Sequence, residues 1–379
     1  MTQLPSISVE ELHRRMNSGE KVFVLDVRGA QAYSEWKINH KNLTSVNITN
    51  STFLKGDERT FDPLPKDQDI IVVCAKGKTA QEVTNMLLGK GYRAVYLEGG
   101  MESWSQFYYP TTVTKDDKME VIQINRLAKG CLSYMIVSEG TALVIDPSIK
   151  TDVYTKLAAE KNAKVAHIMD SHCHADHISG GSKLASETGA TYYISSSEVQ
   201  GTNLKYEPLE KHDSVKFGSV EVEVIPVPTP GHTPGSTSFF VNRKYLMSGD
   251  TIFVGGLGRP DLGGKAKEWA EDLYDTVFKK VSDMPDDVFV LPAHFGDISE
   301  INDNGIVGAT LGEIRDANEI MRTTDRAKFT ETVASAASTL KPPNFEEIVS
   351  INRGEIFVDM ARAAELEIGP NRCAVHHAT

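Results

Sequence analysis

Apolar and polar positions in the first hundred residues alternate between helical spacing and short apolar runs. Ser8 and Glu11 belong to a capping box. The apolar residues Val9, Leu12 and Met16 follow at helical spacing, so the sequence predicts a first helix that ends near Gly19. Apolar runs predict strands at 21–27, 69–73 and 94–97, with a further helix at 79–88. Strands that alternate with helices indicate a small parallel α/β sheet.

The pattern changes twice further along the chain. Residues 105–118 lose periodicity, contain Pro110 and end in a charged cluster, which is typical of a linker. From Met119 on, apolar runs separated by turn residues predict a sheet-rich region with helices between its strands, and after about Leu311 the pattern is helical again. We therefore expect one domain at 1–110 and a second at 118–379, with a core at 118–305 and a helical C-terminal extension at 306–379.

Composition narrows the class of protein. A chain of 379 residues with 40% hydrophobic and 24% charged residues is typical of a soluble globular protein with at least two domains. The formal net charge of −12 argues against nucleic acid as a partner. The start of the chain lacks a signal-peptide pattern, and no apolar run approaches the roughly 20 residues of a membrane span. We expect a cytoplasmic protein without a membrane partner.

Histidines and aspartates gather in the stretch 171–181. His172, His174, Asp176 and His177 cannot all lie on one face of a helix or strand, so they belong to a loop, and the apolar run 165–169 places that loop at the end of a buried strand.

Three later apolar runs also end in a turn that carries a single ligand-type residue. These residues are His232, Asp250 and His294, and five of the 11 histidines of the chain fall at these four turns. We expect the four strand ends to meet at one metal site.

The pattern H-x-H-x-D-H followed by separated His, Asp and His resembles the metallo-β-lactamase superfamily over about residues 119–300. The resemblance implies an αββα sandwich with an active-site metal and leaves the reaction open. The stretches 230–235, 249–251 and 258–261 look like those of the persulfide dioxygenase branch, close kin of glyoxalase II. Phe295-Gly296 stands where many persulfide dioxygenases have Asp-Tyr, so the substrate preference stays open.

In that branch one Fe(II) ion is held by the residues that match His172, His232 and Asp250, which leaves positions for substrate sulfur and O₂. The other candidate residues of these turns are His174, Asp176, His177 and His294. They would either orient the iron ligands or bind a second ion. In the second case Asp250 would bridge the two ions, as in a dinuclear zinc thioester hydrolase. Arg259 and Asp261 match a loop that shapes the family's pocket, or else brace a turn.

Four cysteines without C-x-x-C spacing indicate neither a disulfide framework nor a thiolate zinc site. Cys131 and Cys373 are expected to be buried small side chains, and Cys173 to point away from the metal.

Cys74 is different because it begins a short loop between a strand and a helix. The N–H groups of that loop, with Lys76, Gly77 and Lys78, are expected to stabilise a thiolate or persulfide anion.

This loop, with the stretches 25–28 and 99–104, resembles the rhodanese family over nearly all of residues 5–108. The resemblance implies that Cys74 carries sulfane sulfur. The loop has lysine or threonine where an arginine is common, and residues 35–40 replace the usual Gly-His-Ile turn.

Both resemblances together predict a fused sulfur-oxidising enzyme. It would oxidise a low-molecular-weight thiol persulfide, such as glutathione persulfide, with O₂ to sulfite, while Cys74 exchanges sulfane sulfur with thiosulfate or a persulfide. The alternatives are a glyoxalase II-like zinc thioester hydrolase and a non-enzymatic sulfur-binding or sensing module. Relatives in these families are often dimers, so a homodimer is a further expectation.

Overall fold

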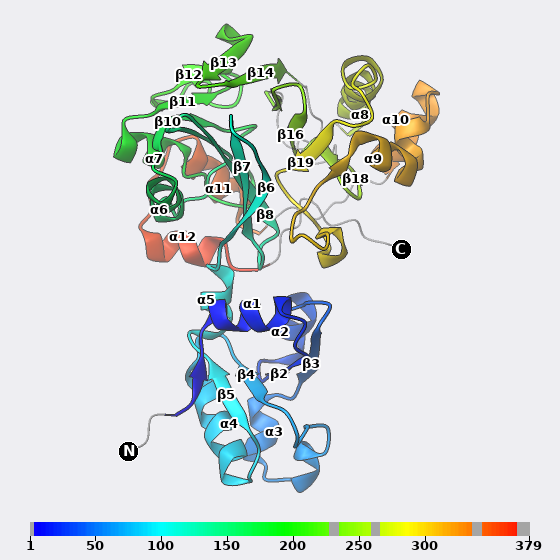
Figure 1. Ribbon diagram of the computed structural model, residues 1–379. Coiled ribbons are helices and arrows are strands. Elements are labelled where there is room, and N and C mark those ends of the chain that lie inside the picture. The colour runs from blue at the N-terminus through cyan, green and yellow to red at the C-terminus, as the bar shows by residue number, and fades with distance from the viewer. Residues whose placement is uncertain (1–3, 227–234, 259–265, 336–342, 370–379) are drawn as a thin grey trace. The chain divides into compact units, whose positions relative to one another are not determined.

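The computed structural model describes residues 4–226, 235–258, 266–335 and 343–369. The chain divides into two compact units, one formed mainly by residues up to Phe107 and the other mainly by residues from Tyr108 on (Figure 1). Four residues singled out from the sequence lie outside the described residues: His232, Arg259, Asp261 and Cys373.

The first unit is a five-stranded parallel sheet with the strand order β1-β5-β4-β2-β3. The strands are β1 (Ser6–Ile7), β2 (Val22–Asp26), β3 (Leu43–Asn47), β4 (Ile70–Val73) and β5 (Ala94–Leu97). The helices are α1 (Val9–Asn17), α2 (Ala30–Glu35), α3 (Asn50–Leu54), α4 (Lys78–Gly89) and α5 (Gly100–Ser105), with a 3-10 helix at Glu58–Phe61. The parallel α/β sheet predicted from the sequence is confirmed.

Local signals placed the elements of this unit well. Ser8 caps α1 by accepting a hydrogen bond of 3.2 Å from the backbone N–H of Glu11, and Val9, Leu12 and Met16 are buried as their helical spacing predicts. The helix expected at 79–88 is α4, whose buried side chains pack with those of β2 and β4 in one apolar core.

The stretch 105–118, which we interpreted as a linker, contains a strand, and the division between the two units falls within it, between Phe107 and Tyr108. Strand β6 (Tyr109–Lys115) pairs antiparallel with β7 (Glu120–Arg126) at the edge of a seven-stranded sheet. Pro110 is tolerated there because an edge strand leaves one row of N–H groups without a ladder partner. The β-branched residues Thr111 to Thr114 favour the extended conformation.

The second unit contains two large sheets. The seven-stranded sheet has the order β12-β11-β10-β9-β8-β7-β6 and the six-stranded sheet the order β13-β14-β15-β16-β19-β20. Further strands of the first sheet are β8 (Cys131–Ser138), β9 (Thr141–Ile145), β10 (Lys164–Met169), β11 (Thr191–Ile194) and β12 (Glu207–Pro208). The second sheet contains β13 (Ser214–Phe217), β14 (Val220–Pro226), β15 (Thr237–Val241), β16 (Tyr245–Gly249), β19 (Phe289–Pro292) and β20 (Ala309–Thr310), and β17 (Ile252–Phe253) pairs with β18 (Gly256–Leu257) in a small hairpin.

Helices cover each large sheet. Helices α6 (Asp152–Glu160) and α7 (Gly181–Thr188) pack on the seven-stranded sheet, and α8 (Ala266–Asp275), α9 (Leu311–Ala317) and α10 (Arg326–Ser335) pack on the six-stranded sheet. Short helical turns lie at Thr276–Lys280, Leu209–Lys211, Ile298–Glu300 and Glu319–Arg322. The unit is an αββα sandwich with a helical C-terminal extension, as expected.

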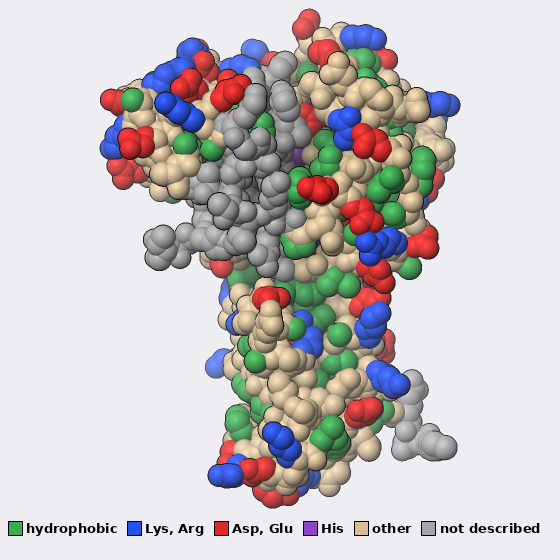
Figure 2. All heavy atoms as spheres, turned by 180° about the vertical axis from the view of Figure 1, so that it is seen from behind, with side chains coloured by type: hydrophobic (Ala, Val, Ile, Leu, Met, Phe, Trp, Pro, Cys, Tyr) green, Lys and Arg blue, Asp and Glu red, His purple; other side chains and the backbone are tan. Residues whose placement is uncertain are grey.

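The last described helices of the extension are α11 (Phe345–Asn352) and α12 (Met360–Leu366), whose apolar side chains pack around Ile178. Among the described residues, no helix has the length and apolar content needed to cross a membrane. Acidic and basic side chains are scattered among one another over the described part of the face in Figure 2.

Candidate metal centre

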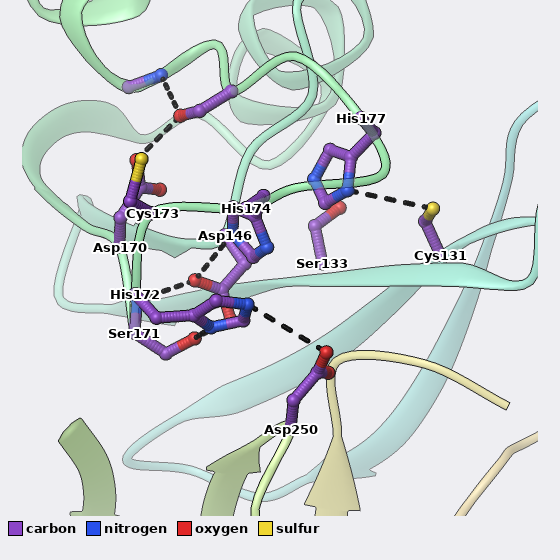
Figure 3. A network of polar contacts seen from close by, with 12 residues as sticks. Cys131, Ser133, Asp146, Asp170, Ser171, His172, Cys173, His174, His177 and Asp250 are labelled. Carbon is purple, nitrogen blue, oxygen red and sulfur yellow. Dashed lines mark hydrogen bonds and ion pairs between the residues drawn. The ribbon is translucent and has the colours of Figure 1, made fainter. Parts of the chain in front are cut away.

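The predicted metal residues come from loops that follow strands. Strand β10 ends at Met169 and leads into the loop of His172, His174, Asp176 and His177, which has no regular secondary structure up to α7. Asp250 directly follows β16, and His294 stands two residues after β19. All six side chains are buried. The structure brings these loops together, as Figure 3 shows for His172, His174, His177 and Asp250.

His172 is held in one orientation by its neighbours. Its Nδ1 lies 2.9 Å from Ser171 Oγ, and Ser171 Oγ donates to Asp146 Oδ2 at 2.9 Å. Because the hydroxyl hydrogen goes to Asp146, the hydroxyl accepts from Nδ1–H, and Nε2 is left with its lone pair. That lone pair faces Asp250, whose Oδ2 is 3.7 Å from Nε2.

His294 lies between two buried carboxylates. Its Nδ1 is 2.5 Å from Asp250 Oδ1, and its Nε2 is 3.1 Å from Asp176 Oδ2. Burial opposes the charged form, yet Asp176 and Asp250 raise the pKa of His294 well above its ordinary value. Two buried carboxylates at this distance require a positive charge beside them, which either an imidazolium or a metal ion can supply.

Cys131, which we expected to be a plain buried side chain, lies in the same cluster. It is buried, but its Sγ is 3.4 Å from Asp176 Oδ2 and 3.7 Å from His177 Nδ1. Burial lowers the pKa of His177, and Cys131 and Asp176 more than compensate and raise it to about 10. One ligand-type atom from each of Cys131, Asp176, His177 and His294 can be chosen so that all lie within 4.8 Å of one another.

The donor set fits a metal ion. Neither ring nitrogen of His174 has a hydrogen-bond partner among the described residues, although the side chain is buried and its Nε2 lies 3.3 Å from Asp146 Oδ1. Burial and the neighbouring His177 lower the pKa of His174, which favours the neutral form that a metal requires. Buried nitrogens without a partner are costly unless an ion takes them up. Imidazole and carboxylate donors suit both iron and zinc.

Glu198 joins the loop of residues 170–180, here called the ligand loop, to a second turn. Its carboxylate accepts hydrogen bonds from the backbone N–H of Cys173 at 2.8 Å and of Gly235 at 2.6 Å. Gly235 follows the segment that contains His232, so Glu198 ties two of the four predicted turns together. Burial and Glu198 raise the pKa of the Cys173 thiol. Cys173 is therefore buried and held in its neutral form.

The loop of Cys74 belongs to the first unit, and the candidate metal residues belong to the second. The Sγ atom accepts hydrogen bonds from the backbone N–H groups of Gly77 at 3.1 Å and Ala80 at 3.3 Å. Gly77 has a φ of 84°, which turns its N–H toward the sulfur. Lys76 and Lys78 are exposed, and the Lys76 ammonium lies 3.7 Å from Glu102. Two backbone N–H groups therefore donate to the sulfur.

Sequence reasoning missed several residues of the candidate metal centre. Asp146 follows β9 in the same way that the other candidates follow their strands, so the same pattern could have found it. Cys131, Glu198, Asn352 and Glu367 gave no signal, because their contacts to the loop join positions far apart in the chain.

Family models match both units of the chain. Residues 8–107 match the rhodanese-like domain and residues 127–294 match the metallo-beta-lactamase superfamily. The chain is a rhodanese-like domain followed by a metallo-β-lactamase superfamily domain.

Two kinds of curated relative are similar to the second domain. Persulfide dioxygenase ETHE1 of Bos taurus is 30% identical over 179 residues, which cover 47% of this chain and 65% of that protein. Hydroxyacylglutathione hydrolase of Prochlorococcus marinus (strain NATL1A) is 30% identical over 158 residues, which cover 40% of this chain and 60% of that protein. The chain therefore spans less than two thirds of the length of these relatives.

Solved structures give a similar result. A metallo-beta-lactamase from Staphylococcus aureus has a TM-score of 0.57 at 26% identity and covers 64% of this chain and 74% of its own. ETHE1 from Myxococcus xanthus has a TM-score of 0.52 at 27% identity and covers 61% of this chain and 96% of its own. These likenesses support a metal-dependent enzyme.

Proposed function

We propose that the protein is a persulfide dioxygenase that oxidises a low-molecular-weight thiol persulfide with O₂ and water to sulfite and the free thiol. One persulfide, one O₂ and one water give one thiol, one sulfite and two protons, so no further oxidant is needed. The observation that carries the proposal is the pair of buried side chains His172 and Asp250, which face each other 3.7 Å apart, in a domain similar to ETHE1.

The metal would be Fe(II), held by His172, His232 and Asp250. Two imidazoles and one carboxylate leave coordination positions at which the iron supplies binding and activation of sulfur and O₂. Ser171 and Asp146 would keep His172 in the tautomer that binds metal, and His294 would hold Asp250 by its short contact.

A second candidate function is thioester hydrolysis at two zinc ions. It is favoured by one observation: Asp176, His177 and His294 gather beside Asp250, where they could hold a second ion. Hydroxyacylglutathione hydrolases are among the relatives as well. The two functions therefore share a fold and differ in metal and reaction.

The first domain would transfer sulfane sulfur through Cys74. Its thiolate would attack the outer sulfur of thiosulfate, form the Cys74 persulfide and release sulfite, and a thiol such as glutathione would then take the sulfur as its own persulfide. The N–H groups of Gly77 and Ala80 would stabilise the anionic sulfur in this step. We also propose a cytoplasmic location, since the buried cysteines Cys74, Cys131 and Cys173 are free thiols.

Metal analysis of anaerobically purified protein, combined with an oxygen electrode, tests the proposal. We expect about one iron per chain and O₂ uptake with glutathione persulfide that stops in His172→Ala. Iron-loaded protein that consumes no O₂ with this substrate would contradict the proposal. Two zinc ions per chain with hydrolysis of a hydroxyacyl thioester of glutathione would establish the second candidate instead.

A further inference from the structure

The ligand loop takes its backbone partners from the far end of the chain. Asn352, the last residue of α11, donates from Nδ2 to the carbonyl oxygens of His174 at 2.8 Å and His177 at 2.9 Å. Its Oδ1 accepts from the N–H of Ser179 at 2.8 Å. All these contacts come from one side chain that is 9% exposed.

Glu367, the residue after α12, makes a fourth contact of this kind. Its Oε1 accepts a hydrogen bond of 2.6 Å from the N–H of Ile178, and the residue is 1% exposed. Ile178 itself packs against Ile348 of α11 and Leu366 of α12. The segments of α11 and α12 therefore contact the ligand loop through both hydrogen bonds and apolar packing.

The loop needs such partners because it has few of its own. Between Met169 and Gly181 the chain is neither helix nor strand, so its peptide groups have no regular ladder to bond with. The direction of an imidazole depends on the orientation of the peptide that carries it. Fixing the carbonyls of His174 and His177 therefore limits where their rings can point.

We propose that Asn352 and Glu367 are positioning residues of the metal centre, which hold the ligand loop in the geometry that retains the metal. They lie outside the stretch 127–294 that matches the superfamily model. The inference rests only on the part of the proposed function that places a metal at this loop, and not on the reaction. A purely structural role predicts a different result: lower stability of the domain with unchanged metal retention.

The test is the rate at which the folded full-length protein, loaded with Co²⁺, releases the metal to excess EDTA. Asn352→Leu removes all three hydrogen bonds of the amide at similar volume, and Glu367→Leu removes the acceptor for Ile178. We expect both to release metal about 10–100 times faster than the unchanged protein, because the loss of groups that orient metal ligands typically lowers metal affinity by about that factor. The visible absorption bands of the bound Co²⁺ should shift as well, because the ligand geometry changes.

Three variants serve as controls. Asn47→Leu removes an amide that donates to two carbonyls in the first unit, those of Asp26 at 2.8 Å and Arg28 at 2.9 Å. Leu273→Ala opens a cavity in the apolar cluster beneath α8 and should lower the melting temperature of the second unit. Glu367→Gln keeps an acceptor for Ile178. All three should release Co²⁺ at close to the original rate.

Should Asn352→Leu fail to fold, Asn352→Asp keeps the shape and the acceptor for Ser179 and loses the two donors. The inference is overturned if folded Asn352 variants release Co²⁺ no faster than Leu273→Ala, or if Glu367→Gln releases it as fast as Glu367→Leu. Release of Co²⁺ needs no turnover. An absence of O₂ uptake would therefore count against the proposed reaction and leave this inference standing.

Discussion

Gly100 is the residue on which the geometry of the Cys74 loop depends most directly. It has a φ of 60°, and a Cβ atom there would lie 2.2 Å from the carbonyl oxygen of Cys74 and 2.9 Å from the N of Gly77. The neighbouring N–H of Met101 donates to the same carbonyl at 2.9 Å. A side chain at position 100 would therefore displace the loop that surrounds the sulfur.

We predict that Gly100→Ala lowers sulfur transfer from thiosulfate to cyanide at least tenfold and lowers the free energy of unfolding by about 1–3 kcal/mol, the usual cost of one strained backbone position. Gly89→Ala is the matched control, because a Cβ there meets no atom within 4 Å and φ is not positive. It should keep full transfer activity and gain about 0.4–1 kcal/mol. Unimpaired transfer in Gly100→Ala would show that the loop tolerates displacement.

His13 gives the first unit a predictable dependence on pH. It lies in α1, with its ring centroid 4.9 Å from that of Phe107, and burial, followed by the charge of His40, lowers its pKa to about 4. The unfolded chain has a histidine pKa of about 6.5 and binds the proton more readily. The part of the free energy of unfolding that depends on His13 is therefore fully present above pH 6.5 and is lost as the pH drops toward 4.

After allowance for solvent screening of a partly exposed side chain, this loss should be about 1–2 kcal/mol. Urea unfolding of the first unit at pH 7 and pH 4.5 measures it, and His13→Gln should reduce the difference by that amount. An equal pH dependence in His13→Gln would assign the acid sensitivity to other groups.

At the scale of single elements, α9 depends on its capping box. Thr310 Oγ1 accepts from the N–H of Glu313 at 3.3 Å, and Glu313 Oε2 accepts from the N–H of Thr310 at 2.9 Å. The helix buries Leu311 and Ile314 in the core under the six-stranded sheet. We predict that Thr310→Ala lowers the free energy of unfolding of the second unit by about 1 kcal/mol, whereas Thr310→Ser keeps it. Denaturant unfolding checks both, and equal losses would contradict the capping role.

Elements with a local signal were predictable and the edge strand was not. The first helix and strands β2, β4 and β5 follow from apolar spacing within ten residues or fewer, and the structure confirms them. Strand β6 was missed because Pro110 and the charged cluster look like a linker, and only its pairing with β7 shows it to be a strand. Pairing of this kind depends on tertiary structure, which a single stretch of sequence does not contain.

At the scale of the whole molecule, the repeated motif of strand, turn and ligand predicted that the loops of His172, Asp250 and His294 would lie together, as they do. It did so because several strand ends of the sandwich lie close together, so residues just after β10, β16 and β19 become neighbours. The contacts of Asn352 could not be predicted, since its hydrogen bond to the carbonyl of His174 joins positions 178 residues apart and involves only a backbone group. A hydrogen bond to a backbone carbonyl does not depend on which residue carries that carbonyl, so the sequence at that position gives no sign of the contact.

The proposed function, together with the two domains, predicts that sulfur transfer and oxidation are separable by mutation. Cys74→Ser should lose transfer from thiosulfate but keep metal and O₂ uptake with glutathione persulfide. Asp250→Asn should lose metal and O₂ uptake but keep sulfur transfer from thiosulfate, because Asp250 belongs to the second unit and Cys74 to the first. With thiosulfate and glutathione as the only sulfur source, neither variant alone should consume O₂, while the unchanged protein does.

A mixture of the two variants then measures what covalent linkage contributes. At equal concentration of each active domain, the mixture must pass glutathione persulfide between separate molecules, whereas in the intact protein both active domains belong to one chain. We expect the mixture to consume O₂ more slowly than the intact protein at nanomolar enzyme and to approach it as the enzyme concentration rises. Equal rates at every concentration would mean that the persulfide equilibrates with bulk solvent before it is oxidised, so that fusion secures equal amounts of both activities and not a faster transfer.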